Sequence, residues 1–253
     1  MPWGLALQKL KTPAVIEVLY GSVVAQENPH VPILDFVGVL RELKDWREAY
    51  DVLAAALRRQ PDDSDLIYEQ AMMAEKLDRL DEAVAAFQRS LALSEDVGVL
   101  TELAEVYVRQ GRVDLAIEEY DKLIRSMPRS PFVDDARYKI GLCYFKLSPG
   151  YGLDQDYTLK AIHQFEIFLD EFPESEWRDE VAGLLAQSKD KLAKKEFMTG
   201  VLYRKMGLLN SARISFDSVI SGFGDSRFVE EALYWKAECH RKVGQLQEAR
   251  TTF

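Results

Sequence analysis

Small apolar residues recur along this chain at intervals that fit pairs of short helices. Six alanines stand 33 to 51 residues apart, and most are followed four residues later by a bulky apolar side chain. Residues four apart lie on one face of a helix, so each pair predicts a helix with a small contact point and a large anchor one turn later. The alanines are Ala49, Ala83, Ala116, Ala161, Ala212 and Ala249, and the bulky residues are Leu53, Phe87, Tyr120, Phe165 and Phe216. Three of these helices reach a proline eight residues further, at Pro61, Pro128 and Pro173.

A unit of two helices repeated about every 34 residues resembles the tetratricopeptide pattern. The resemblance predicts an all-α fold, a right-handed superhelical solenoid of about six helix–turn–helix repeats, the last of them incomplete. Such stacks bind other polypeptides on their concave face and rarely carry out chemistry.

The repeats divide the chain into three predicted parts. Residues 1–29 do not fit the period and are predicted to be an N-terminal capping segment, with a helix from Ala14 to Gln26 and a break over residues 28–32. Residues 30–133 hold repeats one to three, and residues 134–253 hold repeats four to six. The last repeat stops within its second helix, so we expect the natural chain to continue or to be capped by a partner.

Two departures from the period fall in the second half. An insert at 148–158 separates Gly141 from Ala161 by eight more residues than the matching segments of repeats two and three. Loops that project from a rigid helical stack are where recognition concentrates. The second departure is an extra helix at 176–192, which either joins the helix around Gly200 as one long helix or bends away from it near Lys191.

Two tyrosines of the insert, Tyr151 and Tyr157, have no repeat position that assigns them to the core. They are candidates for contact with a partner, because an aromatic ring gains contact area at low entropic cost. The alternative is that Tyr151 folds the loop back onto its own repeat. By contrast, the repeat pattern places Phe165 and Phe168 in the core.

The charge balance argues against nucleic acid as a partner. The chain carries 42 acidic and 32 basic residues, a formal net charge of −10, and a phosphate-binding surface needs the opposite sign. One group of lysines, at 189, 191, 194 and 195, is spread around more than one face of a helix and is interpreted as solvated. No apolar run approaches the roughly 20 residues that cross a bilayer.

Nothing in the sequence points to an enzyme, a cofactor or a metal site. The histidines and cysteines do not fall at metal-ligand spacing, and no phosphate loop, dinucleotide fingerprint or nucleophile elbow is present. Cys143 and Cys239 occupy the same position in different repeats, so they are interpreted as buried apolar residues rather than a disulfide. His240 takes a position held by tyrosine in other repeats and is interpreted as a packing residue.

The second half of the chain resembles a specific family, BamD, the tetratricopeptide lipoprotein of the outer-membrane β-barrel assembly machine. The similarity runs over residues 130–253. It is carried by DDARYKIGLCYFKL at 134–147, by the insert SPGYGLDQDYT at 148–158, by KAIHQFEIFLDEFPESEW at 160–177 and by KDKLAKKEFMTGVLYRKMG at 189–207. The insert and the Lys-Leu-Ala-x-x-Glu-Phe segment are its most specific parts.

This resemblance implies a location on the periplasmic face of the outer membrane, binding to the POTRA domains of the barrel-forming protein, and a role in receiving unfolded outer-membrane polypeptides. The family contacts its assembly partner through the second helix of repeat five, which here carries Arg213 and Asp217; Ser215 stands where some relatives have an arginine. In the insert, Tyr151, Leu153, Asp154 and Tyr157 are the candidate contacts. The family begins at a lipid-modified cysteine after a signal sequence, and neither is visible here, so membrane association is expected only through an anchor that this chain does not show.

Two readings of the function therefore stand side by side. One is a non-catalytic scaffold of the BamD kind. The other is a generic tetratricopeptide adaptor, cytoplasmic or periplasmic, such as a coordinator of envelope or cell-division proteins that binds partner peptides in its groove. An enzyme built on a helical-repeat scaffold is a third alternative, kept only formally.

Overall fold

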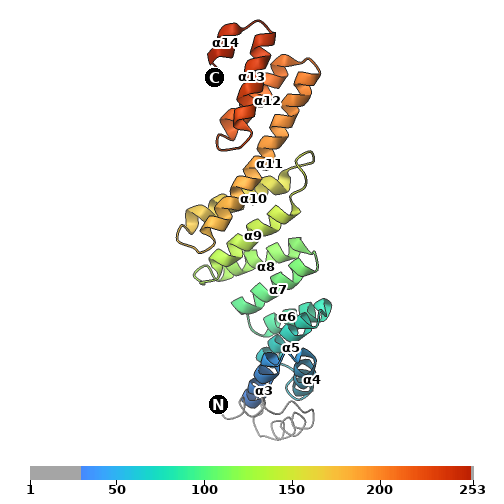
Figure 1. The fold of residues 1–253 in the computed structure, drawn as a ribbon. Coiled ribbons are helices and arrows are strands. Elements are labelled where there is room, and N and C mark those ends of the chain that lie inside the picture. The colour runs from blue at the N-terminus through green and yellow to red at the C-terminus, as the bar shows by residue number, and fades with distance from the viewer. Residues whose placement is uncertain (1–29, 252–253) are drawn as a thin grey trace. The chain divides into compact units, whose positions relative to one another are not determined.

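The computed structural model describes residues 30–251, and every regular element in that range is an α-helix (Figure 1). The chain forms two compact units, Met1–Ser130 and Pro131–Phe253. The first contains α3 (His30–Glu42), α4 (Trp46–Leu57), α5 (Ser64–Lys76), α6 (Leu80–Leu93), α7 (Val97–Arg109) and α8 (Val113–Ser126). The second contains α9 (Val133–Leu147), α10 (Asp156–Glu171), α11 (Arg178–Lys205), α12 (Leu209–Gly222), α13 (Val229–Lys242) and α14 (Leu246–Thr251). The predicted all-α helical-repeat class is confirmed, while the capping segment predicted at 1–29 lies outside the described residues.

Within each unit every helix packs on the next along the chain, and the small residues mark where the helices touch. Ala49, Ala83, Ala116, Ala161 and Ala212 are fully buried, as are the aromatic anchors Phe87, Phe165 and Phe216. Ala249 is the exception, because α14 has no buried residue. The first helix, α3, begins at His30, inside the stretch predicted as a break, so that part of the prediction is wrong at its C-terminal end.

The turns between paired helices share one backbone conformation and one hydrogen bond. In five of them a residue with positive φ ends the first helix: Lys44, Asp78, Gly111, Gly207 and Gly244. The next amide donates back to a carbonyl five residues earlier, as in Arg112 N to Tyr107 O at 2.9 Å. This is the Schellman closure, which satisfies carbonyls that the helix end would otherwise leave without a partner. The connection from α9 to α10 lacks it and carries the insert instead.

Helix α11 runs without a break through 28 residues and serves two repeats. Val181, Leu184 and Leu185 on its N-terminal half pack with Phe165 and Phe168 of α10. Further along, Ala193 and Phe197 pack with α12 and α13. Of the two arrangements predicted for the segment at 176–192, the structure shows the first, one long helix that continues through Lys191. No proline lies within this helix, and its two glycines, Gly183 and Gly200, are accommodated in it.

The cysteines and His240 lie where the repeat pattern predicts. Cys143 and Cys239 are buried and free. Burial raises the pKa of the Cys143 thiol to about 11, so it stays protonated and unreactive at neutral pH. His240 is buried at the end of α13, and its Nδ1 lies 3.1 Å from Gln245 Oε1 in the following turn.

Candidate functional site

The insert between α9 and α10 is an ordered loop built around one buried side chain. Gln155 Nε2 donates to the carbonyls of Gly150 (3.0 Å), Leu153 (3.1 Å) and Asp154 (3.1 Å). Its Oε1 accepts from the Thr158 hydroxyl at 2.7 Å. Since both ends of the amide are used, Gln155 holds the loop in one curved course immediately before α10 begins.

The loop also rests on α11 through three lysines. Lys191 Nζ lies 2.6 Å from Ser148 Oγ, where the insert begins. One turn further, Lys195 Nζ donates to the Leu153 carbonyl at 3.0 Å, and Lys194 Nζ lies 4.4 Å from the centre of the Tyr151 ring. The insert therefore runs along α11 toward its C-terminal end, and burial lowers the pKa of Lys191 at its base.

These contacts decide how the four candidate residues of the insert lie. Tyr151 is half-buried under Lys194 of α11, so it packs on the helix of the following repeat rather than on its own repeat. Tyr157 belongs to the first turn of α10, where its ring stacks on Tyr144 with centroids 6.4 Å apart. By contrast, Leu153 is 64% exposed and Asp154 is exposed beside it. Tyr151 and Tyr157 are therefore packed against helices, whereas Leu153 is exposed to solvent.

The second candidate group lies on α12, where Arg213 and Asp217 are held by contacts to α13 and the turn after it. Arg213 Nη1 donates to Gln245 Oε1 at 2.9 Å, and Asp217 pairs with Lys236 at 2.5 Å. Between them, Ile214 is 67% exposed. Ser215, where some relatives carry an arginine, is buried, so that position offers no contact to a partner here.

Several of these residues are not predicted from the sequence. Nothing in the pattern marks a single glutamine as the centre of a loop, although Gln155 stands in the Leu-Asp-Gln motif that carries the resemblance. The interpretation of the lysines as solvated is wrong for Lys191, Lys194 and Lys195, which all contact the insert. Lys189 pairs with Glu166 of α10 instead. Their spacing of three and four residues was the available signal.

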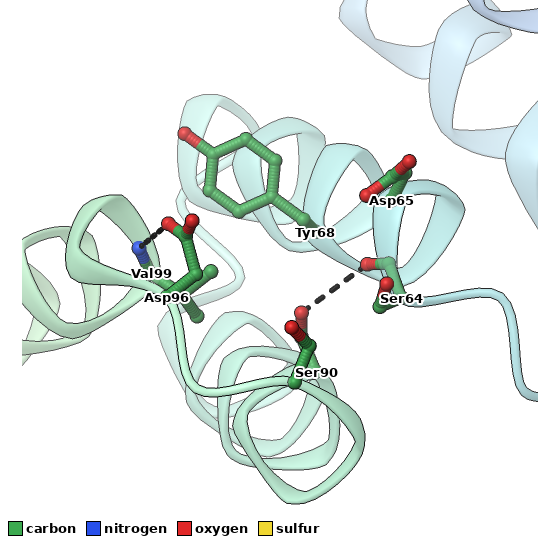
Figure 2. Close-up of a pocket in the computed structure, with 7 residues that line it drawn as sticks. Ser64, Asp65, Tyr68, Ser90, Asp96 and Val99 are labelled. Carbon is green, nitrogen blue, oxygen red and sulfur yellow. Dashed lines mark hydrogen bonds between the residues drawn. The ribbon is translucent and has the colours of Figure 1, made fainter.

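A polar cleft of about 300 Å³ lies in the first unit, between α5, the end of α6 and the start of α7 (Figure 2). Ser90 Oγ donates to the Ser64 carbonyl across it at 3.2 Å, and the Asp96 carboxylate caps α7 by accepting from Gly98 N and Val99 N. Tyr68 of α5 lines the same cleft (Figure 2). Burial, aided by the charges of Glu102 and Glu69, raises the pKa of Tyr68 to about 12, so its hydroxyl keeps the proton at a pH where an ordinary tyrosine releases it.

Within residues 30–251 no three His, Cys, Asp or Glu side chains gather as a metal site would require. None of the helices in that range combines the length and the apolar character needed to cross a bilayer. The arrangement is suited to contact with other molecules through exposed side chains held on rigid helices.

Comparison with known proteins gives this arrangement a context. The model of the outer membrane lipoprotein family YfiO matches residues 62–252, more than half of the chain. The outer membrane protein assembly factor BamD of Caulobacter vibrioides is 27% identical over 135 residues, which cover 53% of this chain and 44% of that protein. BamD of Neisseria meningitidis is 25% identical over 159 residues, 59% of this chain and 60% of that protein. The chain thus spans about half the length of these relatives.

Among solved structures, a tetratricopeptide repeat protein from Parabacteroides merdae superposes with a TM-score of 0.50 and 17% identity, over 87% of this chain and 76% of that one. At this identity the likeness shows the fold alone.

Proposed function

The chain belongs to the YfiO family of outer membrane lipoproteins, and on that premise we propose that it is a non-catalytic scaffold of outer-membrane β-barrel assembly. In this proposal it works on the periplasmic face of the outer membrane and binds the POTRA domains of the barrel-forming protein. Its repeats also receive unfolded segments of outer-membrane proteins. The relatives named as assembly factors and the helical-repeat fold support this proposal.

The observation that carries the proposal is the exposed Ile214 between two oriented charged residues on α12. Covering an isoleucine that is 67% exposed stabilises the complex with a partner, because burial of apolar surface contributes about 25 cal/mol per Å². Arg213 and Asp217 are already fixed by Gln245 and Lys236, so binding orders few new rotamers. This is also the helix to which the family resemblance assigns the assembly contact.

Purified POTRA domains provide the test, with affinity measured by calorimetry. Ile214→Asp should weaken binding roughly tenfold or more, because it places a charge in an apolar contact. Leu93→Asp is the matched control, since Leu93 is also exposed on a helix but lies in the first unit. Circular dichroism of both variants checks that the helices remain intact.

No binding of the wild-type chain to POTRA domains would contradict the proposal, and equal binding by the wild type and Ile214→Asp would contradict the contact through α12. The first would favour the generic adaptor, whose partners are peptides of other proteins. The second would leave POTRA binding in place and move the contact away from α12.

A further inference from the structure

The surface where the insert lies on α11 combines unpaired positive charge with exposed apolar side chains. We call it the insert face and define it by Tyr151, Leu153, Lys194, Lys195, Met198 and Leu202. Lys195 holds the Leu153 carbonyl at 3.0 Å, which places the exposed Leu153 beside the turn of α11 that carries Lys194 and Lys195. Met198 and Leu202 follow Lys194 at successive intervals of four residues, so all three lie on one stripe of the helix.

The lysines of the insert face differ from several other cations of the second unit, which form ion pairs. Lys189, Arg137 and Lys236 are paired with Glu166, Glu171 and Asp217. In the part of the chain that the structure describes, Lys194 and Lys195 have no carboxylate within salt-bridge distance; they hold a ring and a carbonyl oxygen. In a chain with a net charge of −10, these two ammonium groups remain available to the carboxylates of a partner.

Three carboxylates stand near these lysines, in the insert, at the start of α10 and on α11. Asp154 uses one oxygen to accept from the Asp156 backbone amide at 2.9 Å. Asp156 lies in the first turn of α10, where the helix dipole favours a negative charge. Glu196 is a direct neighbour in sequence and is half-exposed on α11. None of the three forms an ion pair with Lys194 or Lys195 within the described residues.

The apolar part of the insert face is equally unusual. Leu153 is 64% exposed, Leu202 is 56% exposed and Met198 is exposed between them. Single exposed apolar residues are ordinary on protein surfaces, but several exposed apolar residues grouped together mark a candidate contact surface for a partner.

We infer that the insert face binds an acidic segment of another polypeptide. Carboxylates of that segment pair with Lys194 and Lys195, and its apolar side chains cover Leu153, Met198 and Leu202. Charge complementarity selects the segment and the leucines add affinity. An anionic lipid surface fits less well, because electrostatic membrane binding draws on clusters of about four to eight basic residues, and only two ammonium groups stand here.

This inference is independent of the proposed contact on α12, so the two can fail separately. Its test uses the full chain and fluorescence anisotropy with a short synthetic peptide in which Glu residues flank a Leu-Phe pair. The comparison peptide has Gln in place of every Glu. The variants are Lys194→Glu and Leu153→Ser, and the control is Lys122→Glu, the same charge change on the exposed surface of α8.

The acidic peptide should bind the wild-type chain, and added salt should weaken binding because exposed charges are screened. Lys194→Glu should weaken it roughly tenfold or more, Leu153→Ser by a smaller factor, and Lys122→Glu not measurably. Melting temperatures of all variants are compared to exclude unfolding.

Any of the following results would overturn the inference. One is no binding of the acidic peptide. Another is equal binding of the Glu and Gln peptides, or equal binding by wild type and Lys194→Glu. The last is binding to phosphatidylglycerol vesicles without binding of the peptide. Such binding, absent with phosphatidylcholine and lost in Lys194→Glu, would assign the surface to lipid.

Discussion

The Phe165 ring of α10 lies against the backbone of Gly141 in α9, so that a β-carbon on Gly141 would stand 2.5 Å from Phe165 Cε1. The same relationship joins Gly200 of α11 to Phe216 of α12, at 2.7 Å. Gly141→Ala should therefore destabilise the chain by about 1–3 kcal/mol, because the buried ring must shift within a packed core. Urea unfolding measures this difference.

Gly183→Ala is the matched control for that substitution. Gly183 also lies within a helix, but no atom stands within 4 Å of its added β-carbon. Alanine should stabilise α11 there by about 0.5–1 kcal/mol, since glycine loses more backbone entropy in a helix. Equal effects at Gly141 and Gly183 would show that the Phe165 contact does not determine the outcome.

The residues of this contact also show what the sequence could predict. Ala161 and Phe165 stand four apart, and local spacing of that kind is visible without a structure. The anchoring of the insert is different: Lys191 and Ser148 are 43 residues apart, and their meeting depends on how α9, α10 and α11 pack. The sequence also could not predict that α11 is continuous. No residue near Lys191 breaks a helix, and none excludes a bend.

A second prediction concerns Lys44, which holds a left-handed conformation with φ of 59°. Side chains with a β-carbon are strained there by about 1–2 kcal/mol, and glycine is not. Lys44→Gly should raise the free energy of unfolding by about 0.5–1 kcal/mol, since Lys44 is exposed and loses little contact.

The reciprocal variant is Gly111→Ala, at the same turn position two repeats later. Its φ is +74° and no atom lies within 4 Å of an added β-carbon, so any loss comes from the backbone alone. It should cost about 1 kcal/mol. A neutral result at both positions would mean that the left-handed turn residue does not limit stability.

A third prediction follows from Tyr68 in the polar cleft of the first unit. Burial raises its pKa from 10.0 to about 12, so the folded chain keeps the phenolic proton at a pH where the unfolded chain releases it. Its contribution to stability is fully present below pH 10 and is lost as the pH rises toward 12. The stability difference between wild type and Tyr68→Phe should shift in favour of the variant across this window. Urea midpoints that change in parallel for the two proteins would contradict it.

The fourth prediction concerns Gln155, on which the order of the insert depends. Gln155→Ala removes the partner of three carbonyls and of the Thr158 hydroxyl at a position only 5% exposed. We expect a loss of about 1–3 kcal/mol, the cost of leaving buried polar groups without a hydrogen bond. Hydrogen exchange at residues 150–154 should accelerate more than in the helices. Gly152→Ala is the control, because its added β-carbon meets no atom within 4 Å.

The same variant separates the two halves of the insert face. Lys194, Met198 and Leu202 belong to α11 and keep their places when the loop loosens, whereas Leu153 is positioned by the loop that Gln155 and Lys195 hold. Gln155→Ala should therefore weaken binding of the acidic peptide by about the factor that Leu153→Ser does, and combining the two should add little, since coupled residues are not additive. Full additivity would mean that Gln155 does not act through Leu153.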